Sequence, residues 1–240
     1  VGDKNLAYFS RPTLVADRLV ELLTGRDIYQ DIWVTLTEVA IGYAGGAIVG
    51  VLMGFVLGRY KFLSDALQPY IIALYSIPQI ALAPLFIVWF GLGIQSKIAV
   101  VAVMTFFLVF FSAYSGFVGV NEELIRLARL MGASWYQAVR RVLLPNAAHQ
   151  IFIGLKTAVP YAVIGAVIGE YIGANHGLGH FILYSSQTYD APGLFSGIVI
   201  LVVIVFLANA CLNRLERRLM RWKQTTDSGI KPSARIRTAA

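Results

Sequence analysis

The sequence is poor in charged residues. Asp, Glu, Lys and Arg make up only 14% of its 240 residues, whereas 58% are hydrophobic. A soluble domain usually has about 25% charged residues. Most of the surface of this protein therefore cannot face water, and the mean hydropathy of +0.69 agrees with that. The composition predicts a membrane protein.

Cysteine is almost absent as well. The single Cys211 excludes a disulfide within the chain, and no cysteine-based metal site is suggested. The sequence also lacks a Gly-x4-Gly-Lys-Ser/Thr phosphate-binding loop. If ATP drives this protein, ATP and Mg must bind to another polypeptide. No convergent set of catalytic residues is visible, so we expect neither an enzyme nor a cofactor or metal on this chain.

Long stretches without any charge are the most prominent feature of the sequence. A membrane-spanning helix needs about 20 apolar residues. Asp, Glu, Lys and Arg are missing from residues 39–58, 66–96, 98–120 and 191–213. A fifth apolar stretch is interrupted by Lys156 and closed by Glu170, both near its ends, where long side chains can reach the interface. We predict an all-α polytopic membrane helix bundle with spans at 33–58, 66–91, 97–118, 149–172 and 194–214.

The basic residues predict the orientation of these spans. The links after the first, third and fifth spans hold eleven Lys and Arg, whereas the links after the second and fourth hold only Lys97. Basic links face the cytoplasm, so we expect a cytoplasmic C-terminus. The basic residues lie next to the ends of the spans and form no continuous patch. The net charge of +7 therefore indicates a membrane surface and not a nucleic-acid partner.

An odd number of spans places residue 1 outside, and we expect a sixth, preceding span to be missing from this sequence, which begins with Val1. Pro12–Leu23 has its leucines on one stripe and predicts an amphipathic surface helix. The predicted domains are an extracytoplasmic segment with this helix (1–32), a transmembrane domain (33–214) with a cytoplasmic loop at 119–148, and a basic cytoplasmic tail (215–240).

The first predicted span carries glycine at every fourth position. These residues form a bare stripe down one helix face, along which another backbone can approach closely: Gly42, Gly46, Gly50, Gly54 and Gly58. Simple helix packing within the chain is the favoured interpretation, and a sliding surface between moving helices is the alternative.

Two prolines, Pro78 and Pro84, interrupt the second predicted span. They break the backbone hydrogen-bond ladder, which is tolerated in a membrane where neighbours or a cavity satisfy the freed carbonyls. The polar residues beside the break either line a cavity or belong to a self-satisfied kink. With a tyrosine of the aromatic-rich third span, they are the candidate pathway-lining residues: Tyr75, Ser76, Gln79 and Tyr114.

The loop Asn121–His149 has the pattern of two short helices around a hinge. Asn121 can cap a first helix that begins with two glutamates, and Gly132 suits the left-handed residue that ends it. Ser134 and Gln137 have the spacing of a capping box, and Pro145 is expected to stop the second helix. Apolar residues in this loop need a partner surface or the membrane underside: Leu124, Leu127, Leu130, Met131 and Trp135.

This loop resembles the conserved permease loop of ABC importers, Glu-Ala-Ala-x3-Gly-x9-Ile-x-Leu-Pro. The matching residues are Ala128, Gly132, Leu144 and Pro145, with Val142 as a conservative match. Two residues depart from the motif, because Arg126 replaces the acid and Leu127 replaces the first alanine.

The resemblance covers about residues 12–220. The segments Pro78–Gly93 and Glu170–Gly179 are similar to the permease branch that serves nitrate, sulfonates and taurine. Glu38 stands where that branch more often has a basic residue.

The resemblance implies the permease subunit of a type I ABC importer in a bacterial cytoplasmic membrane. Two permease copies, expected to be a homodimer in membrane lipid, would form the pathway. An ATPase dimer would bind the loop Asn121–His149 of each copy. An external binding protein would deliver a sulfonate, taurine, nitrate or a small ring compound such as a vitamin precursor. The residues implied to couple to the ATPase are Ala128, Gly132, Ala133, Ser134, Trp135, Leu144 and Pro145.

Five polar residues in or between the last two predicted spans have more local interpretations. Glu170 is expected to bond the backbone of the Gly-rich loop after it, with a gating or docking role as the alternative. Lys156 is expected to reach the cytoplasmic interface, and Asp190 is a candidate contact for the binding protein. His176 and His180 lack a third metal ligand nearby, which favours contact with the binding protein over metal binding.

A secondary transporter or channel that works without an ATPase is the main alternative. Such a protein would carry ionisable residues deep within its spans for ion coupling, and the centres of the predicted spans have none.

Overall fold

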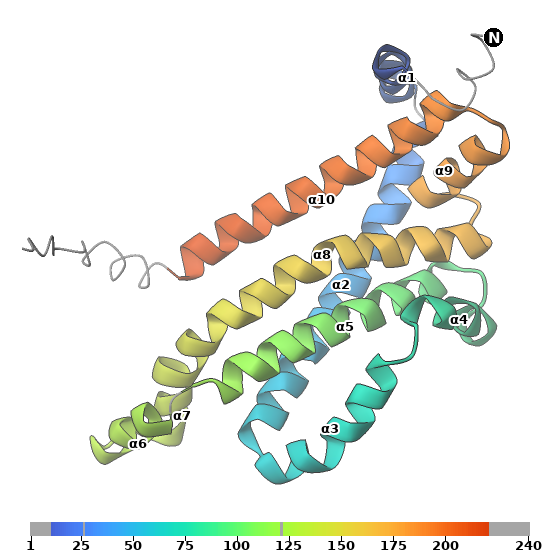
Figure 1. The fold of residues 1–240 in the computed structure, drawn as a ribbon. Coiled ribbons are helices and arrows are strands. Elements are labelled where there is room, and N and C mark those ends of the chain that lie inside the picture. Colours follow the sequence, from blue (N-terminus) through green and yellow to red (C-terminus); the bar gives the residue numbers. More distant parts are fainter. Residues whose placement is uncertain (1–10, 26, 121, 221–240) are drawn as a thin grey trace, which may run out of the picture.

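The computed structural model describes residues 11–25, 27–120 and 122–220, and these residues are almost entirely helical (Figure 1). The elements in chain order are α1 (Pro12–Thr24), α2 (Asp27–Arg59), α3 (Lys61–Tyr75), the 3₁₀ helix η1 (Gln79–Leu82), α4 (Ala83–Phe90), α5 (Ile94–Val118), α6 (Glu122–Leu130), α7 (Trp135–Ala138), the π-helical turn η2 (Val139–Leu143), α8 (Leu144–Gly173), α9 (Leu178–Gln187) and α10 (Ala191–Leu219).

Four helices of the described residues are long and apolar enough to cross a membrane: α2, α5, α8 with the turns before it, and α10. The second predicted span, 66–91, is not one helix. Instead, α3 and the segment η1–α4 meet at 81°, so they form either one broken span or a re-entrant loop. The all-α membrane bundle is confirmed, and so is the interruption that Pro78 and Pro84 predict within 66–91.

The prolines explain the break between α3 and α4. Proline disfavours the helical conformation of the residue before it, and the chain leaves α3 at Ser76, two residues before Pro78. Pro84 then lies in the first turn of α4, where its missing N–H costs nothing because helix starts leave that group unbonded.

Three helices, α2, α5 and α8, form the core, with α5 in contact with both others (Figure 1). The glycine face of α2 lies against α5. A Cβ atom built on Gly46 would stand 2.3 Å from the carbonyl oxygen of Ala102, and one on Gly50 would stand 2.9 Å from that of Phe106. Only glycine allows the two backbones to approach this closely. The face continues through Gly42, Gly54 and Gly58, each equally close to α5.

Pro145 does not end the second short helix of the loop, so that prediction is wrong. It lies in the first turn of α8, and the chain is helical without interruption from Trp135 to Gly173. The π-helical turn η2 makes this continuation possible, because there the N–H of Leu144 bonds to the carbonyl of Val139, five residues back. The side chain of Asn146 donates to the Val142 carbonyl, four residues back, at 2.7 Å.

The amphipathic helix is confirmed as α1. It crosses the beginning of α10 at the end of the bundle where α9 lies, called here the α9 end (Figure 1). Leu19 and Leu22 pack onto a small core formed by Ile28, Leu178 and Ile200. Hydrogen bonding to Glu21, with the charge of Asp190, raises the pKa of the Arg18 guanidinium against the opposing effect of burial.

The contact between α2 and α5 gives a direct test. We expect Gly46→Ala to destabilise the protein by about 1–3 kcal/mol, because the new methyl group overpacks the interface. Gly45→Ala is the matched control, since a Cβ at Gly45 meets nothing within 4 Å. The control should be neutral or slightly stabilising, because alanine favours helix over glycine. The free energy of unfolding in detergent measures both variants, and equal effects would contradict the packing described here.

Candidate functional site

The first helix of the loop, α6, ends in a Schellman motif. Gly132 has a φ of +85°, the left-handed conformation that the sequence predicts. Its N–H bonds to the carbonyl of Arg129 at 3.0 Å, and the N–H of Ala133 bonds to that of Ala128 at 3.0 Å. These two bonds are the pair that defines the motif. Asn121, the predicted cap at the other end of α6, lies outside the described residues.

The second helix, α7, begins with the predicted capping box. The backbone N–H of Gln137 donates to the Ser134 hydroxyl at 3.3 Å, and the backbone N–H of Ser134 donates to the Gln137 side chain at 2.8 Å. Because both bonds and the Schellman motif are made within a few residues, the angle between α6 and α7 is set locally. The segment α6–α7 is called the elbow below.

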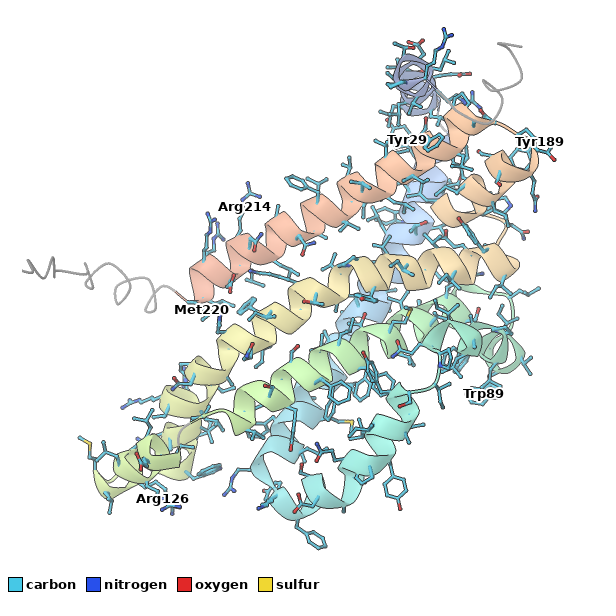
Figure 2. All side chains as sticks on the ribbon, viewed as in Figure 1. Tyr29, Trp89, Arg126, Tyr189, Arg214 and Met220 are labelled. Atoms are coloured by element: carbon cyan, nitrogen blue, oxygen red, sulfur yellow. The ribbon has the colours of Figure 1, made fainter. Side chains whose placement is uncertain are left out.

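The elbow presents apolar side chains to its surroundings. Leu130 is 85% exposed and Met131 is 81% exposed. Leu124, Leu127, Trp135 and Tyr136 are also exposed. Figure 2 places Arg126 on the elbow, at the opposite end of the molecule from Tyr189. An apolar surface at the tip of a projecting segment marks a docking site for another protein or for a membrane.

The predicted coupling residues divide between the elbow and the helix behind it. Ala128, Gly132, Ala133, Ser134 and Trp135 lie on the elbow, whereas Leu144 and Pro145 lie in the first turn of α8.

Two contacts connect the elbow to the spans. Leu143 and Ala147 are buried against Phe117 of α5, with Ile125 of α6 packed beside them. Separately, the guanidinium of Arg59, at the end of α2, lies 4.3 Å from the ring centre of Trp135 on α7, within the range of a cation–π interaction.

The structure does not place the four candidate pathway residues in one cavity of the described part. The Tyr75 ring packs on Phe107 and Phe111 of α5, with ring centres 5.5 and 5.0 Å apart. Ser76 donates to the carbonyl of Ile72 in its own helix. Gln79 is half-buried in η1. Tyr114 alone of the four lines the cavity at the elbow end described below.

A group of buried polar residues, called the α9 cluster, lies at the opposite end. It comprises Asp31, Thr35 and Glu38 of α2, Lys97 of α5 and Glu170 of α8. Three of its members bond the backbone N–H groups that begin α9. Gly177 donates to Asp31 at 2.8 Å, Leu178 donates to Thr35 at 2.9 Å, and Gly179 donates to Glu170.

Thr35 and Glu170 also bond to each other, since the Thr35 hydroxyl donates to the Glu170 carboxylate at 2.6 Å. Helix starts leave their first N–H groups unbonded and favour negative charge. Side chains from α2 and α8 therefore hold the start of α9 in place, which confirms the expected bonding of Glu170 to the glycine-rich loop.

Lys97 and Glu38 lie buried beside this network. Lys97 is only 4% exposed, and its ammonium donates to the carbonyls of Leu92 and Gly173 at 2.7 and 2.8 Å. It thus ties the end of α8 to the loop before α5. Glu38 is 1% exposed, and one of its carboxylate oxygens has no hydrogen-bond partner among the described residues.

From the sequence, Lys97 is placed in the link after the second predicted span, and Asp31 and Thr35 have no predicted role. A signal was present, because residues 31, 35, 38, 42 and 46 follow one another at helical spacing. The polar positions continue the glycine stripe toward the α9 end, so they share the buried face of α2.

Three of the remaining candidates, Lys156, Asp190 and His176, have partners within the chain. Lys156 forms an ion pair with Glu216 of α10 and does not simply reach for the interface. Asp190 caps α10 by accepting from the N–H of Gly193 at 3.0 Å, and it pairs with Arg18 at 3.2 Å. His176 lies 3.6 Å from Asp31. In the described part of the chain, no three His, Cys, Asp or Glu are grouped to hold a metal ion.

The arrangement matches a known family. Residues 46–221 match the family described as "Binding-protein-dependent transport system inner membrane component". The chain belongs to this family. It is a multi-pass membrane protein and a permease subunit of an ABC importer, as the loop motif predicted.

Curated relatives can be aligned with most of this chain. The chain is 37% identical to the formylaminopyrimidine transport permease of Halalkalibacterium halodurans, over 79% of this chain and 76% of the relative. It is 30% identical to the putative aliphatic sulfonates transport permease of Bacillus subtilis, over 94% and 82%. The riboflavin transport system permease of Chloroflexus aurantiacus is 33% identical, over 88% and 79%.

Solved structures agree with the type I importer fold. The permease matches a chain of the methionine ABC transporter MetNI in an inward-facing conformation, with a TM-score of 0.63, 25% identity and coverage of 80% of this chain and 94% of that one.

The α9 cluster gives the second prediction. We expect Thr35→Val to lower the free energy of unfolding by about 1–3 kcal/mol, because the N–H of Leu178 loses its acceptor in a buried site. Thr37→Val is the matched control, since that exposed hydroxyl bonds only within its own helix, to the carbonyl of Trp33. Denaturant unfolding of both purified variants checks this, and an unchanged Thr35→Val protein would show that the start of α9 does not depend on α2.

Proposed function

We propose that the permease transmits ATP-driven motion from a separate ATPase dimer through the elbow α6–α7. The observation that carries the proposal is the elbow itself, a segment held in shape by its own caps that exposes Leu130 and Met131 at its tip. The cost of exposing these side chains to water is removed when a groove on a partner covers them.

The two connections behind the elbow would carry the motion into the spans. A displaced elbow pushes on α5 and α8 through Leu143, and it pulls on α2 through Arg59 and Trp135. Because α2 and α5 meet along glycine with almost no side chain between them, they would move as one unit.

We propose that the elbow faces the cytoplasm, as does the C-terminus, in a bacterial cytoplasmic membrane. The basic links after the predicted first, third and fifth spans support this orientation. ATP and Mg would bind to the ATPase, since the sequence has no phosphate-binding loop. A second permease copy would complete the pathway, and an external binding protein would dock at the α9 end.

For the solute, we propose a small ring compound of the pyrimidine type, with aliphatic sulfonates as the second candidate. The formylaminopyrimidine and sulfonate permeases among the relatives support both classes. The ring compound is placed first because the formylaminopyrimidine permease is 37% identical to this chain and the sulfonate permease is 30% identical.

The elbow proposal predicts the effect of a change at the hinge. A Cβ on Gly132 would meet nothing within 4 Å, so Gly132→Val acts only through the strain of a β-branched residue at positive φ. We expect coupled uptake to fall at least about tenfold in proteoliposomes while the ATPase still hydrolyses ATP, since a misplaced elbow breaks the coupling. Gly132→Asn is the control, because asparagine tolerates this conformation, and it should keep most uptake.

The same proteins also test whether the ATPase binds the elbow and whether the elbow faces the cytoplasm. The purified ATPase should bind inside-out vesicles that contain the permease and not right-side-out ones. Met131→Asp should weaken that binding. Solute uptake without any ATPase, or normal coupling in Gly132→Val, would overturn the proposal.

The solute proposal predicts which loaded binding protein stimulates the transporter. We expect the neighbouring binding protein, loaded with a formylaminopyrimidine, to raise ATP hydrolysis by the reconstituted complex. The same protein incubated with an aliphatic sulfonate should leave hydrolysis at its basal rate. Stimulation by the sulfonate alone would reverse the order of the two candidates.

A further inference from the structure

A cavity of about 500 Å³ lies at the elbow end, between the end of α2, the start of α3, the end of α5 and the elbow. Its apolar lining includes Phe55 and Phe117, and Leu143 is buried beside them. The charged residues that line it are Arg59, Lys61, Asp65, Arg126 and Arg129. Four are cationic and one is anionic, so the cavity is strongly positive.

Three of these cations have no acidic partner. Arg59, Lys61 and Arg129 form no ion pair with any residue in the described ranges, and Arg59 instead lies against the Trp135 ring. Cations that outnumber the one carboxylate in a recess with apolar walls attract an anion, because the low dielectric strengthens the interaction.

The start of α3 adds hydrogen-bond donors to the same cavity. Its N-cap residue, Tyr60, makes no side-chain capping bond, so the first N–H groups of α3 receive no bond from it. Lys61 and Ser64 of this first turn line the cavity, and the Ser64 hydroxyl bonds the Tyr114 hydroxyl at 2.7 Å. Backbone N–H groups at a helix start, beside lysine and arginine, suit the oxygens of a phosphate group.

The position of the cavity indicates where such a phosphate would come from. The cavity lies where α2 and α5 end, which is the level of the lipid headgroups. Phe62 is 87% exposed and Tyr60 is 58% exposed beside the lining residues, and exposed aromatic side chains are typical of this level. The tip of the elbow, which we assign to the ATPase, is apolar and so is a different surface.

We propose that this cavity binds the phosphate headgroup of an anionic phospholipid from the cytoplasmic leaflet. The proposal rests on the cytoplasmic orientation of the elbow given above. The bound headgroup neutralises Lys61 of α3 and Arg129 of the elbow together, so it links the two elements that flank the cavity. Basic pockets between membrane helices on this side of a bilayer bind such headgroups.

The test uses the permease–ATPase complex in nanodiscs of phosphatidylcholine with a minor share of phosphatidylglycerol. Native mass spectrometry counts the phosphatidylglycerol that stays bound. We expect Lys61→Gln/Arg129→Gln to weaken its retention about tenfold or more. The matched control is Arg217→Gln/Arg218→Gln, which removes the same charge from the exposed end of α10 and should retain the lipid as the wild type does. Lys61→Arg/Arg129→Lys should also retain it.

Three results would overturn the proposal. The first is an equal loss of lipid in the control variant, which would indicate only a diffuse surface charge. The second is displacement of the lipid by inorganic phosphate, which would indicate a soluble ligand. The third is that the permease alone retains the lipid and the permease–ATPase complex does not. That result would indicate that an acidic residue of the ATPase occupies the cavity. None of these depends on whether uptake is coupled to ATP, so failure here is distinguishable from failure of the elbow mechanism.

Discussion

The close contact between α2 and α5 is the interaction on which the rest of the structure depends. Lipid is as apolar as leucine, so helices in a membrane associate through close packing and not through exclusion of water. The glycine face of α2 brings its backbone against that of α5, and α8 packs beside the same helix. The parts that carry function lie at the two ends of this three-helix unit.

The two ends are built by different kinds of interaction. At the α9 end, carboxylates and a hydroxyl from α2 and α8 cap a third helix, and the Lys97 ammonium closes the last turn of α8. The bonds to Thr35 and Glu170 are buried and the other two are partly buried, so losing one partner leaves the other unsatisfied at a cost. At the elbow end, the shape is set by local caps and the contacts are apolar or cationic. The α9 end is thus suited to stay fixed and the elbow end to engage partners.

This difference gives a physical account of coupling. In the proposed mechanism, a rigid elbow would transfer a displacement without absorbing it, because the conformation of Gly132 and the caps resist a change of angle. The π-helical turn and Pro145 join the elbow to α8 without a loop, so the displacement reaches a spanning helix directly. The lipid headgroup proposed for the adjacent cavity would join α3 to the same elbow.

Features that depend on residues near one another in the chain could be predicted from the sequence. Charge-free stretches located the spans, since a charge in lipid is costly. The spacing of glycine located the packing face, and Gly132 with Ser134 and Gln137 located the elbow and its caps, because caps are made within one or two turns.

Features that depend on distant residues were decided only by the tertiary structure. The prolines predict a break in the second predicted span, but only the folded chain gives its angle of 81°. Pro145 continues a helix because Asn146 and η2 rearrange the local bonds. Glu38 and Lys97 lie near the starts of predicted spans, yet both are buried, and the Lys97 ammonium bonds the end of α8 and the loop before α5. Gly173 lies 76 residues from Lys97 in the sequence, and only the fold brings the two into hydrogen-bonding distance.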